Sequence, residues 1–107
     1  MGHIIVLCTG SEGEATRIAK TLVEEHFVAC ANVIDAESFF WWNGHVQEEK
    51  EKLLIMKTRE DVWDNLRDRI KELHSYELPE IIAVPVKYGL EDYLRWIEDM
   101  VGEKWKS

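Results

Sequence analysis

The sequence predicts an α+β fold in which helices cover one face of an antiparallel sheet, within a single domain over residues 1–107. Three observations predict it. Residues 3–9 are a continuous apolar, β-branched run, which is typical of a buried central strand. Apolar side chains recur at helical spacing in three later segments. An Asn43-Gly44 pair, the strongest short-range hairpin signal, separates two long strand-like segments. With 46% apolar and 32% charged residues, the chain has the composition of a folded domain.

The first helix is predicted over about residues 12–26, directly after the first strand. Ser11 and Glu14 match the capping box S-x-x-E, in which each side chain binds a backbone N–H at the start of the helix. The apolar stripe expected to face the sheet consists of Ala15, Ile18, Ala19, Leu22 and Val23.

A long hairpin follows, with strands predicted over residues 28–42 and 45–58. The Asn43-Gly44 turn joins them, because both central residues of a type I′ turn need positive φ. The first half of the return strand is charged and its second half is apolar. We therefore expect the tip of this ribbon to leave the core.

The second helix is predicted over about residues 59–73, with Thr58 and Asp61 as its cap. Residues 80–88 form the fourth predicted strand. Pro85 lies inside it, and a proline inside a strand indicates an edge or a bulge because it cannot donate to the ladder.

A third amphipathic helix is predicted over about residues 90–104. The predicted order is therefore β-α-β-β-α-β followed by one more helix. Right-handed crossovers around a central hairpin convert this order into a ferredoxin-like βαββαβ fold with a long central hairpin and an extra C-terminal helix.

Four consecutive aromatic residues precede the hairpin turn: Phe39, Phe40, Trp41 and Trp42. Alternate side chains of a strand point to opposite faces, so one pair can meet the core of the chain and the other pair cannot. Together they can bury roughly 600–1,000 Å², whereas the largest exposed patch of a typical monomer is about 300–600 Å². We expect self-association; the alternative is that the ribbon curls back over its own sheet or under the last helix.

The formal net charge of −8 disfavours nucleic-acid binding, which relies on Lys and Arg to neutralise phosphates, and it permits binding of cations. Cys8 and Cys30 form no CxxC pattern, so reduced thiols in the cytoplasm are expected. The N-terminus lacks the basic and apolar regions of a secretory signal, and no segment approaches the roughly 20 apolar residues of a membrane span. We expect no membrane partner.

Five segments in this order resemble the CutA family of divalent-ion tolerance proteins. They are "LVEEHFVACAN" (22–32), "FFWWNGHVQEE" (39–49), "LLIMKT" (53–58), "IKELHSYELPEII" (70–82) and "YLRWIE" (93–98). The resemblance covers nearly the whole chain. It implies a ferredoxin-like homotrimer, with the long hairpin and the C-terminal region packed between subunits, and a link to copper and other divalent cations.

The resemblance also implies a metal-ligand set of Cys30, His74 and Glu77. Cys30 stands at the family's cysteine in "A-C-x-N", and His74, Tyr76 and Glu77 match "H-P-Y-E-x-P". Ser75 departs from this pattern, because the family usually has proline there, and the lost rigidity bears on the orientation of His74. Thiolate and imidazole suit copper(II), which heads the affinity series for a given site.

Each ligand has a structural alternative. Cys30 can be a small buried apolar residue, His74 a cation at a helix C-terminus, and Glu77 a solvated carboxylate. The three are distant in sequence, so any site is assembled in space, possibly across subunits.

Two further expectations concern assembly and function. The residues expected to carry the homotrimer are Phe40, Trp41, Trp42, Tyr93 and Trp96. The alternative function is that of a PII-like signalling trimer, which binds a small ligand in the cleft between subunits. An enzyme is not expected. A Cys-His pair can make a nucleophile, but the sequence shows no oxyanion loop and no third group to orient the histidine.

Overall fold

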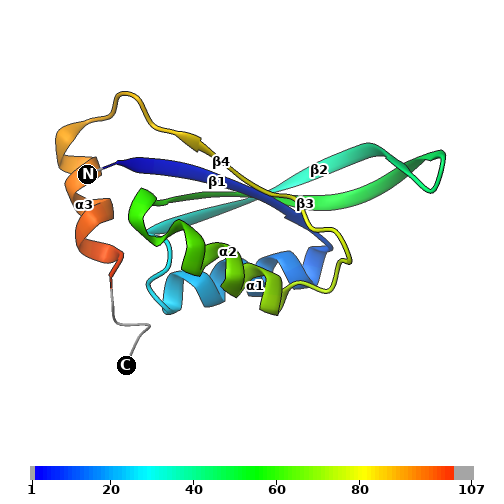
Figure 1. The fold of residues 1–107 in the computed structure, drawn as a ribbon, viewed down its shortest axis with the longest axis horizontal. Helices are drawn as coiled ribbons and strands as arrows, with labels where there is room; N and C mark the ends of the chain where they lie inside the picture. The colour runs from blue at the N-terminus through cyan, green and yellow to red at the C-terminus, as the bar shows by residue number, and fades with distance from the viewer. Residues whose placement is uncertain (1, 103–107) are drawn as a thin grey trace.

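The four strands form one antiparallel sheet in the order β2-β3-β1-β4, which confirms the predicted ferredoxin-like α+β topology. The computed structural model describes residues 2–102 (Figure 1). Its elements are β1 (His3–Gly10), α1 (Glu12–Glu24), β2 (Cys30–Trp42), β3 (His45–Arg59), a 3₁₀ turn (Glu60–Val62), α2 (Trp63–Leu73), β4 (Ile81–Pro85) and α3 (Glu91–Met100).

Helices α1 and α2 lie side by side on one face of the sheet, and α3 lies at the end opposite to the ribbon tip (Figure 1). The main core forms between this face and the two helices. Alternate residues of the central strands enter it, as a half-buried strand requires. The fully buried members are Val6, Cys8, Ile18, Leu22, Leu54, Met56, Leu66 and Ile70. No helix within residues 2–102 is long and apolar enough to cross a membrane.

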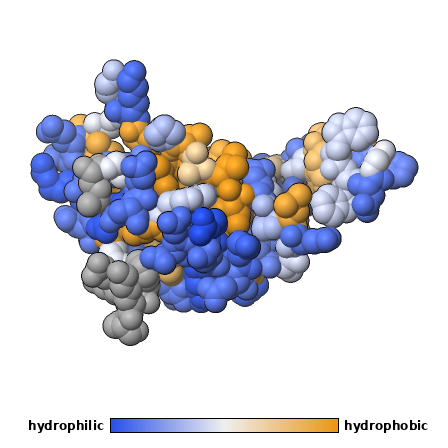
Figure 2. All heavy atoms as spheres, in the orientation of Figure 1, coloured by the Kyte–Doolittle hydropathy of each residue, from blue (hydrophilic) through white to orange (hydrophobic). Residues whose placement is uncertain are grey.

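The opposite face of the sheet is also apolar, and neither α1 nor α2 covers it, while α3 meets its end through His3 and Arg59. Pairing aligns Leu7 with Ile55 and Ile82, and Thr9 with Leu53. Ile82 is 52% exposed and the others are half-buried. Figure 2 shows hydrophobic side chains gathered over the middle of the molecule, where the sheet lies in Figure 1. The open face therefore presents apolar surface to its surroundings.

The hairpin of β2 and β3 projects beyond the rest of the sheet (Figure 1), as predicted. The last pair between β1 and β3 is Gly10 with Lys52, so residues 45–51 pair only with β2. Asn43 (φ 52°) and Gly44 (φ 79°) both take the positive φ that the hairpin signal predicts.

The expectation that one aromatic face of this ribbon meets the core is wrong. Phe39 is 61% exposed, Phe40 40%, Trp41 75% and Trp42 37%. The ribbon does not curl back either, because its aromatic half lies beyond the strands and helices that could cover it. Both faces are open in the single chain.

Two predicted helix caps are wrong, for related reasons. Ser11 occupies the N-cap position of α1 but makes no side-chain capping bond, and the Glu14 carboxylate, the other half of the predicted capping box, binds the distant Ser75 instead. Thr58 is a buried residue of β3 whose hydroxyl donates to the Phe27 carbonyl (2.6 Å), and α2 begins only at Trp63.

The other boundaries differ from the prediction by a few residues. Pro85 ends β4, which is an edge strand, so the edge predicted from this proline is confirmed. Helix α3 ends at Met100, and the last two residues of the predicted helix, 103 and 104, lie outside the described residues. Arg59 Nη1 donates to the Val101 carbonyl (2.9 Å) and the Glu98 carbonyl (3.2 Å), which attaches the end of α3 to the sheet.

Candidate functional site at the base of the ribbon

The segment that leaves α2 passes beside the ribbon and begins with His74, whose side chain is fully buried. His74 Nε2 lies 2.7 Å from the Thr9 carbonyl, and Nδ1 lies 3.2 Å from the Tyr76 backbone N–H. These partners suit a ring that donates from Nε2 and accepts at Nδ1, and Nδ1 also lies 3.9 Å from Glu14 Oε1. Gly10 lies so close that a Cβ there would be 3.4 Å from Nε2. Both nitrogens of His74 are therefore engaged within the chain.

Ser75 is fixed by the carboxylate of Glu14 in α1. The Ser75 N–H donates at 2.5 Å and its hydroxyl donates at 2.6 Å, one to each oxygen. Burial raises the pKa of Glu14, but the two hydrogen bonds from Ser75, together with the charges of His74 and Arg17, hold that pKa below its ordinary value. A proline at position 75 would have neither donor. The two hydrogen bonds therefore fix the backbone at position 75 to α1, where a proline would restrict it through its ring.

Tyr76 connects the same segment to the ribbon. Its hydroxyl donates to Glu51 Oε2 (2.8 Å), and its ring lies 4.5 Å from the ring of His74. Burial raises the pKa of Tyr76, and the hydrogen bond to Glu51 and the charge of that carboxylate raise it further. Glu51 itself is only 8% exposed. The phenol therefore stays protonated and supplies a donor to a buried carboxylate.

A groove runs between this segment and the ribbon, and we call it the aromatic groove. It consists of two adjoining hollows of about 700 and 360 Å³, a size typical of small-molecule sites. The lining residues common to both hollows are Phe40, Trp42, Tyr76 and Leu78. Glu51 lines the larger hollow, and Glu49 and Glu77 line the smaller one.

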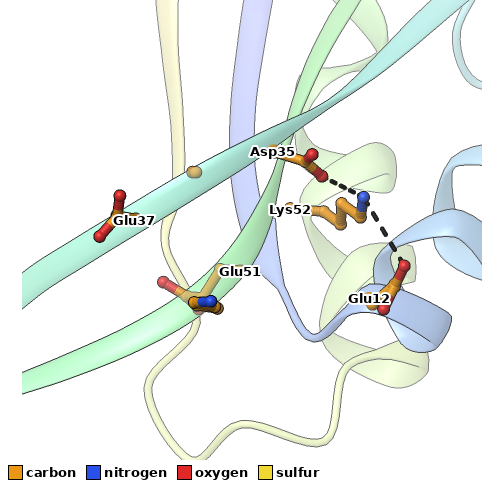
Figure 3. Close-up of a pocket in the computed structure, with 7 residues that line it drawn as sticks. Glu12, Asp35, Glu37, Glu51 and Lys52 are labelled. Carbon is orange, nitrogen blue, oxygen red and sulfur yellow. Dashed lines mark hydrogen bonds and ion pairs between the residues drawn. The ribbon is translucent and has the colours of Figure 1, made fainter.

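A further pocket of about 470 Å³ lies on the ribbon base beside the start of α1 and shares Glu37 and Glu51 with the larger hollow. Lys52 Nζ donates to Asp35 and lies 3.8 Å from the Glu12 carboxylate. Figure 3 shows Lys52 turned toward these two residues, with Glu37 and Glu51 apart from the contact. The hydrogen bond from Lys52 lowers the pKa of Asp35. This acidic pocket therefore already contains a cation of its own.

The predicted ligands Cys30 and His74 do not meet within one chain. Cys30 pairs with Lys57, which pairs with Ile5, whereas His74 binds Thr9 at the other end of β1. The four-residue offset along the strand corresponds to about 13 Å. Glu77 is exposed beside the aromatic groove. Within residues 2–102, no three His, Cys, Asp or Glu side chains are arranged to hold a metal ion.

Cys30 instead belongs to a polar cluster near α3. Its Sγ lies 3.9 Å from Lys57 Nζ and 4.0 Å from Asn32 Oδ1. Burial raises the pKa of Tyr93, and the charge of Cys30 and a hydrogen bond with its sulfur raise it further. The ring of Tyr93 lies 5.4 Å from that of Trp96, and the two are 42% and 40% exposed. Two of the expected interface residues thus stand next to the predicted thiol ligand.

Two residues of the site were missed in the sequence. Glu14 was assigned to a helix cap, and its partner Ser75 is 61 residues away. Glu51 belongs to a charged run, "QEEKEK", whose other members are exposed or half-exposed. Its one distinguishing feature is its position, because it directly precedes Lys52, the first residue of β3 that pairs with β1.

Comparison with known proteins agrees on one family. The family model of the CutA1 divalent ion tolerance protein matches residues 3–100. The divalent-cation tolerance protein CutA of Pyrococcus horikoshii is 47% identical over 95 residues, which cover 88% of this chain and 93% of that protein.

Solved structures agree as well. The structure of the periplasmic divalent cation tolerance protein CutA from Archaeoglobus fulgidus has a TM-score of 0.91 at 40% identity, covering 94% of this chain and 99% of that one. The PII-like protein CutA from Nostoc sp. PCC 7120 in apo form has a TM-score of 0.89 at 36% identity, covering 95% and 98%.

Proposed function

Because the chain belongs to the CutA1 divalent ion tolerance protein family, we propose that it is a homotrimer that binds divalent cations, copper(II) by preference, in metal-ion tolerance or response. The proposal is one of binding and not of catalysis. Within one chain, His74 binds Thr9 and Tyr76 at the other end of the sheet from Cys30, so the two do not form a nucleophile-base pair there.

The observation that carries the proposal is the amount of apolar surface that the single chain leaves open. Large apolar side chains are exposed on both faces of the aromatic ribbon and on the sheet face opposite α1 and α2; a large apolar patch of this kind is typical of an interaction surface. Subunit contacts would cover them. The residues proposed to carry assembly are Phe40, Trp41, Trp42, Tyr93 and Trp96.

The cation site proposed for this assembly lies between subunits. Cys30, His74 and Glu77 are its ligands, and their separation in one chain requires that two chains contribute. Cys30 is half-exposed and accessible to an ion, whereas His74 must release the Tyr76 N–H from Nδ1 to coordinate one. The thiolate and imidazole donors support a preference for copper(II).

Native mass spectrometry with copper(II) added below and above one equivalent per chain tests this proposal. We expect a trimer that takes up one ion per chain, with uptake lost in both Cys30→Ala and His74→Ala. A monomer would refute the assembly. Equal, loose uptake in the wild type and both variants would refute the site and leave the assembly intact.

The second candidate function is that of a PII-like sensor that binds a small organic ligand in a cleft between subunits. The aromatic groove supports it, because the groove is of small-molecule size and lies on the ribbon that would meet a neighbour. Cys30→Ala separates the two candidates: metal binding fails in this variant, and binding of an organic ligand survives. The proposed compartment is the cytoplasm, which the two free cysteines support.

A further inference from the structure

Residues 75–80, which connect His74 to β4 and which we call the strap, close over the His74 ring. That ring is fully buried, and the ring of Tyr76 lies 4.5 Å from it. His74 Nδ1 lies 3.2 Å from the Tyr76 backbone N–H. An accepting imidazole nitrogen has a single lone pair in the plane of the ring. A ligand of Nδ1 must therefore take the place that the Tyr76 N–H now occupies.

The side chain of Tyr76 fastens the strap to the ribbon. Its hydroxyl donates to Glu51 Oε2 at 2.8 Å, and Glu51 is only 8% exposed. A buried acceptor that loses its donor is destabilised by its own desolvation. The contact with Glu51 therefore favours the closed position of the strap.

One residue thus makes both contacts, through its backbone with His74 and through its side chain with Glu51. Moving the Tyr76 N–H away from Nδ1 also moves the phenol that the same backbone carries. A hydrogen bond is no longer made beyond about 3.5 Å, so a displacement of Tyr76 by about 1 Å is enough to break its contact with Glu51. Access to Nδ1 and closure of the strap on the ribbon are therefore alternatives.

We propose that the strap is a latch on the cation site: Tyr76 must leave both His74 Nδ1 and the Glu51 carboxylate before His74 can act as a ligand. The inference rests on the metal function proposed above and names how that site is regulated. The stability of the closed contact opposes binding, so a weaker contact with Glu51 must give tighter binding of the cation. By the same linkage, binding of the cation must open the strap.

Tyr76→Phe tests the latch, because it removes the hydroxyl that binds Glu51, keeps the ring and changes no charge. We expect copper(II) to bind full-length Tyr76→Phe about three- to tenfold more tightly than the wild type, in calorimetry with glycine as a competing chelator. Tyr88→Phe is the matched control, since it removes the same hydroxyl from a side chain that is 83% exposed. It should change the affinity less than about twofold. Unchanged or weaker binding in Tyr76→Phe would overturn the latch, because a contact that only supports the site would give one of these results.

Hydrogen exchange of the wild type gives a second measurement that needs no variant. The Tyr76 amide is held by His74 Nδ1 in the closed strap. Saturation with copper(II) should therefore speed exchange in peptides that span residues 74–80, as followed by mass spectrometry. Unchanged or slower exchange in these peptides would overturn the latch.

His74→Ala keeps these results separate from the function proposed above. Copper uptake that is lost in His74→Ala, together with an unaltered affinity in Tyr76→Phe, refutes the latch while the metal function stands. Equal uptake in the wild type and His74→Ala refutes the site and the latch together.

Discussion

The contact between Glu14 and Ser75 allows a quantitative test of how the segment after α2 is held. Ser75→Ala removes the hydroxyl that donates at 2.6 Å to Glu14 and keeps the backbone N–H that donates at 2.5 Å. The Glu14 side chain is 12% exposed, so solvent replaces the lost donor only in part. A hydrogen bond to a charged group contributes about 1.5–3 kcal/mol. We expect Ser75→Ala to lower the free energy of unfolding by about 1–2 kcal/mol at pH 7.

The stabilisation that Ser75 provides should depend on pH in a definite direction. The pKa of Glu14 lies below the ordinary value of 4.5 in the folded protein. Stabilisation by a carboxylate with a lowered pKa is fully present above its pKa in the unfolded chain and is lost as the pH falls through its folded value. The difference between the wild type and Ser75→Ala should therefore be complete at neutral pH and should shrink in acid.

Urea unfolding followed by circular dichroism at one protein concentration measures both effects. Ser11→Ala is the matched control, because Ser11 is exposed at the N-cap of α1 and makes no side-chain capping bond. It should cost less than about 0.5 kcal/mol, whereas a working capping box would cost about 1 kcal/mol. A larger loss in Ser11→Ala than in Ser75→Ala, or a Ser75→Ala deficit that persists in acid, would refute the reasoning.

Three other predictions follow from the site and the ribbon. Tyr76→Phe leaves the buried Glu51 carboxylate without its donor, so the free energy of unfolding should fall by about 1–3 kcal/mol in urea unfolding; an unchanged midpoint would contradict the contact. Trp41→Glu places a charge on a side chain that is 75% exposed, so native mass spectrometry should find dissociated but folded chains; an intact trimer would exclude Trp41 from the interface. Burial, and then nearby carboxylates, raise the pKa of Cys8 to about 12, so iodoacetamide at pH 8 should alkylate Cys30 before Cys8. Peptide mass mapping measures the two labelling rates, and equally fast labelling of Cys8 would refute the prediction.

The fold could be predicted from the sequence because its signals are local. The period of the apolar residues identified the helices and the buried strands, and Asn43-Gly44 identified the hairpin, since turn chemistry depends on adjacent residues. The exposure of both ribbon faces could not be predicted in this way. This exposure arises because β1 ends at Gly10 and leaves the outer half of the hairpin without a third strand. The alternation of side chains along β2 and β3 is the same with or without such a neighbouring strand.

The site could be predicted only in part, because its contacts join residues far apart in sequence. Ser11 and Glu14 have the spacing of a capping box, yet Glu14 is bound by Ser75, which offers two donors to one carboxylate. Ser11, Glu12 and Gly13 at the start of α1 are exposed residues, and water satisfies the first N–H groups of a helix where no side chain caps them. The Glu14 carboxylate can bind either the start of its own helix or a distant donor that the fold brings near. Here it binds Ser75, which offers two donors.

The same reasoning explains why assembly decides between the two proposed functions. In the single chain, His74 has both nitrogens engaged and lies about four strand residues from the level of Cys30, so the metal ligands depend on a second subunit. The lining residues of the aromatic groove, by contrast, come from one chain, with Glu51 held by Tyr76 and Tyr76 held next to His74. His74 therefore positions Tyr76 at the edge of the groove through Nδ1. To bind copper it must abandon that role, because Nδ1 cannot accept the Tyr76 N–H and coordinate a metal at the same time. Metal binding through His74 and ligand binding in the groove should consequently oppose each other.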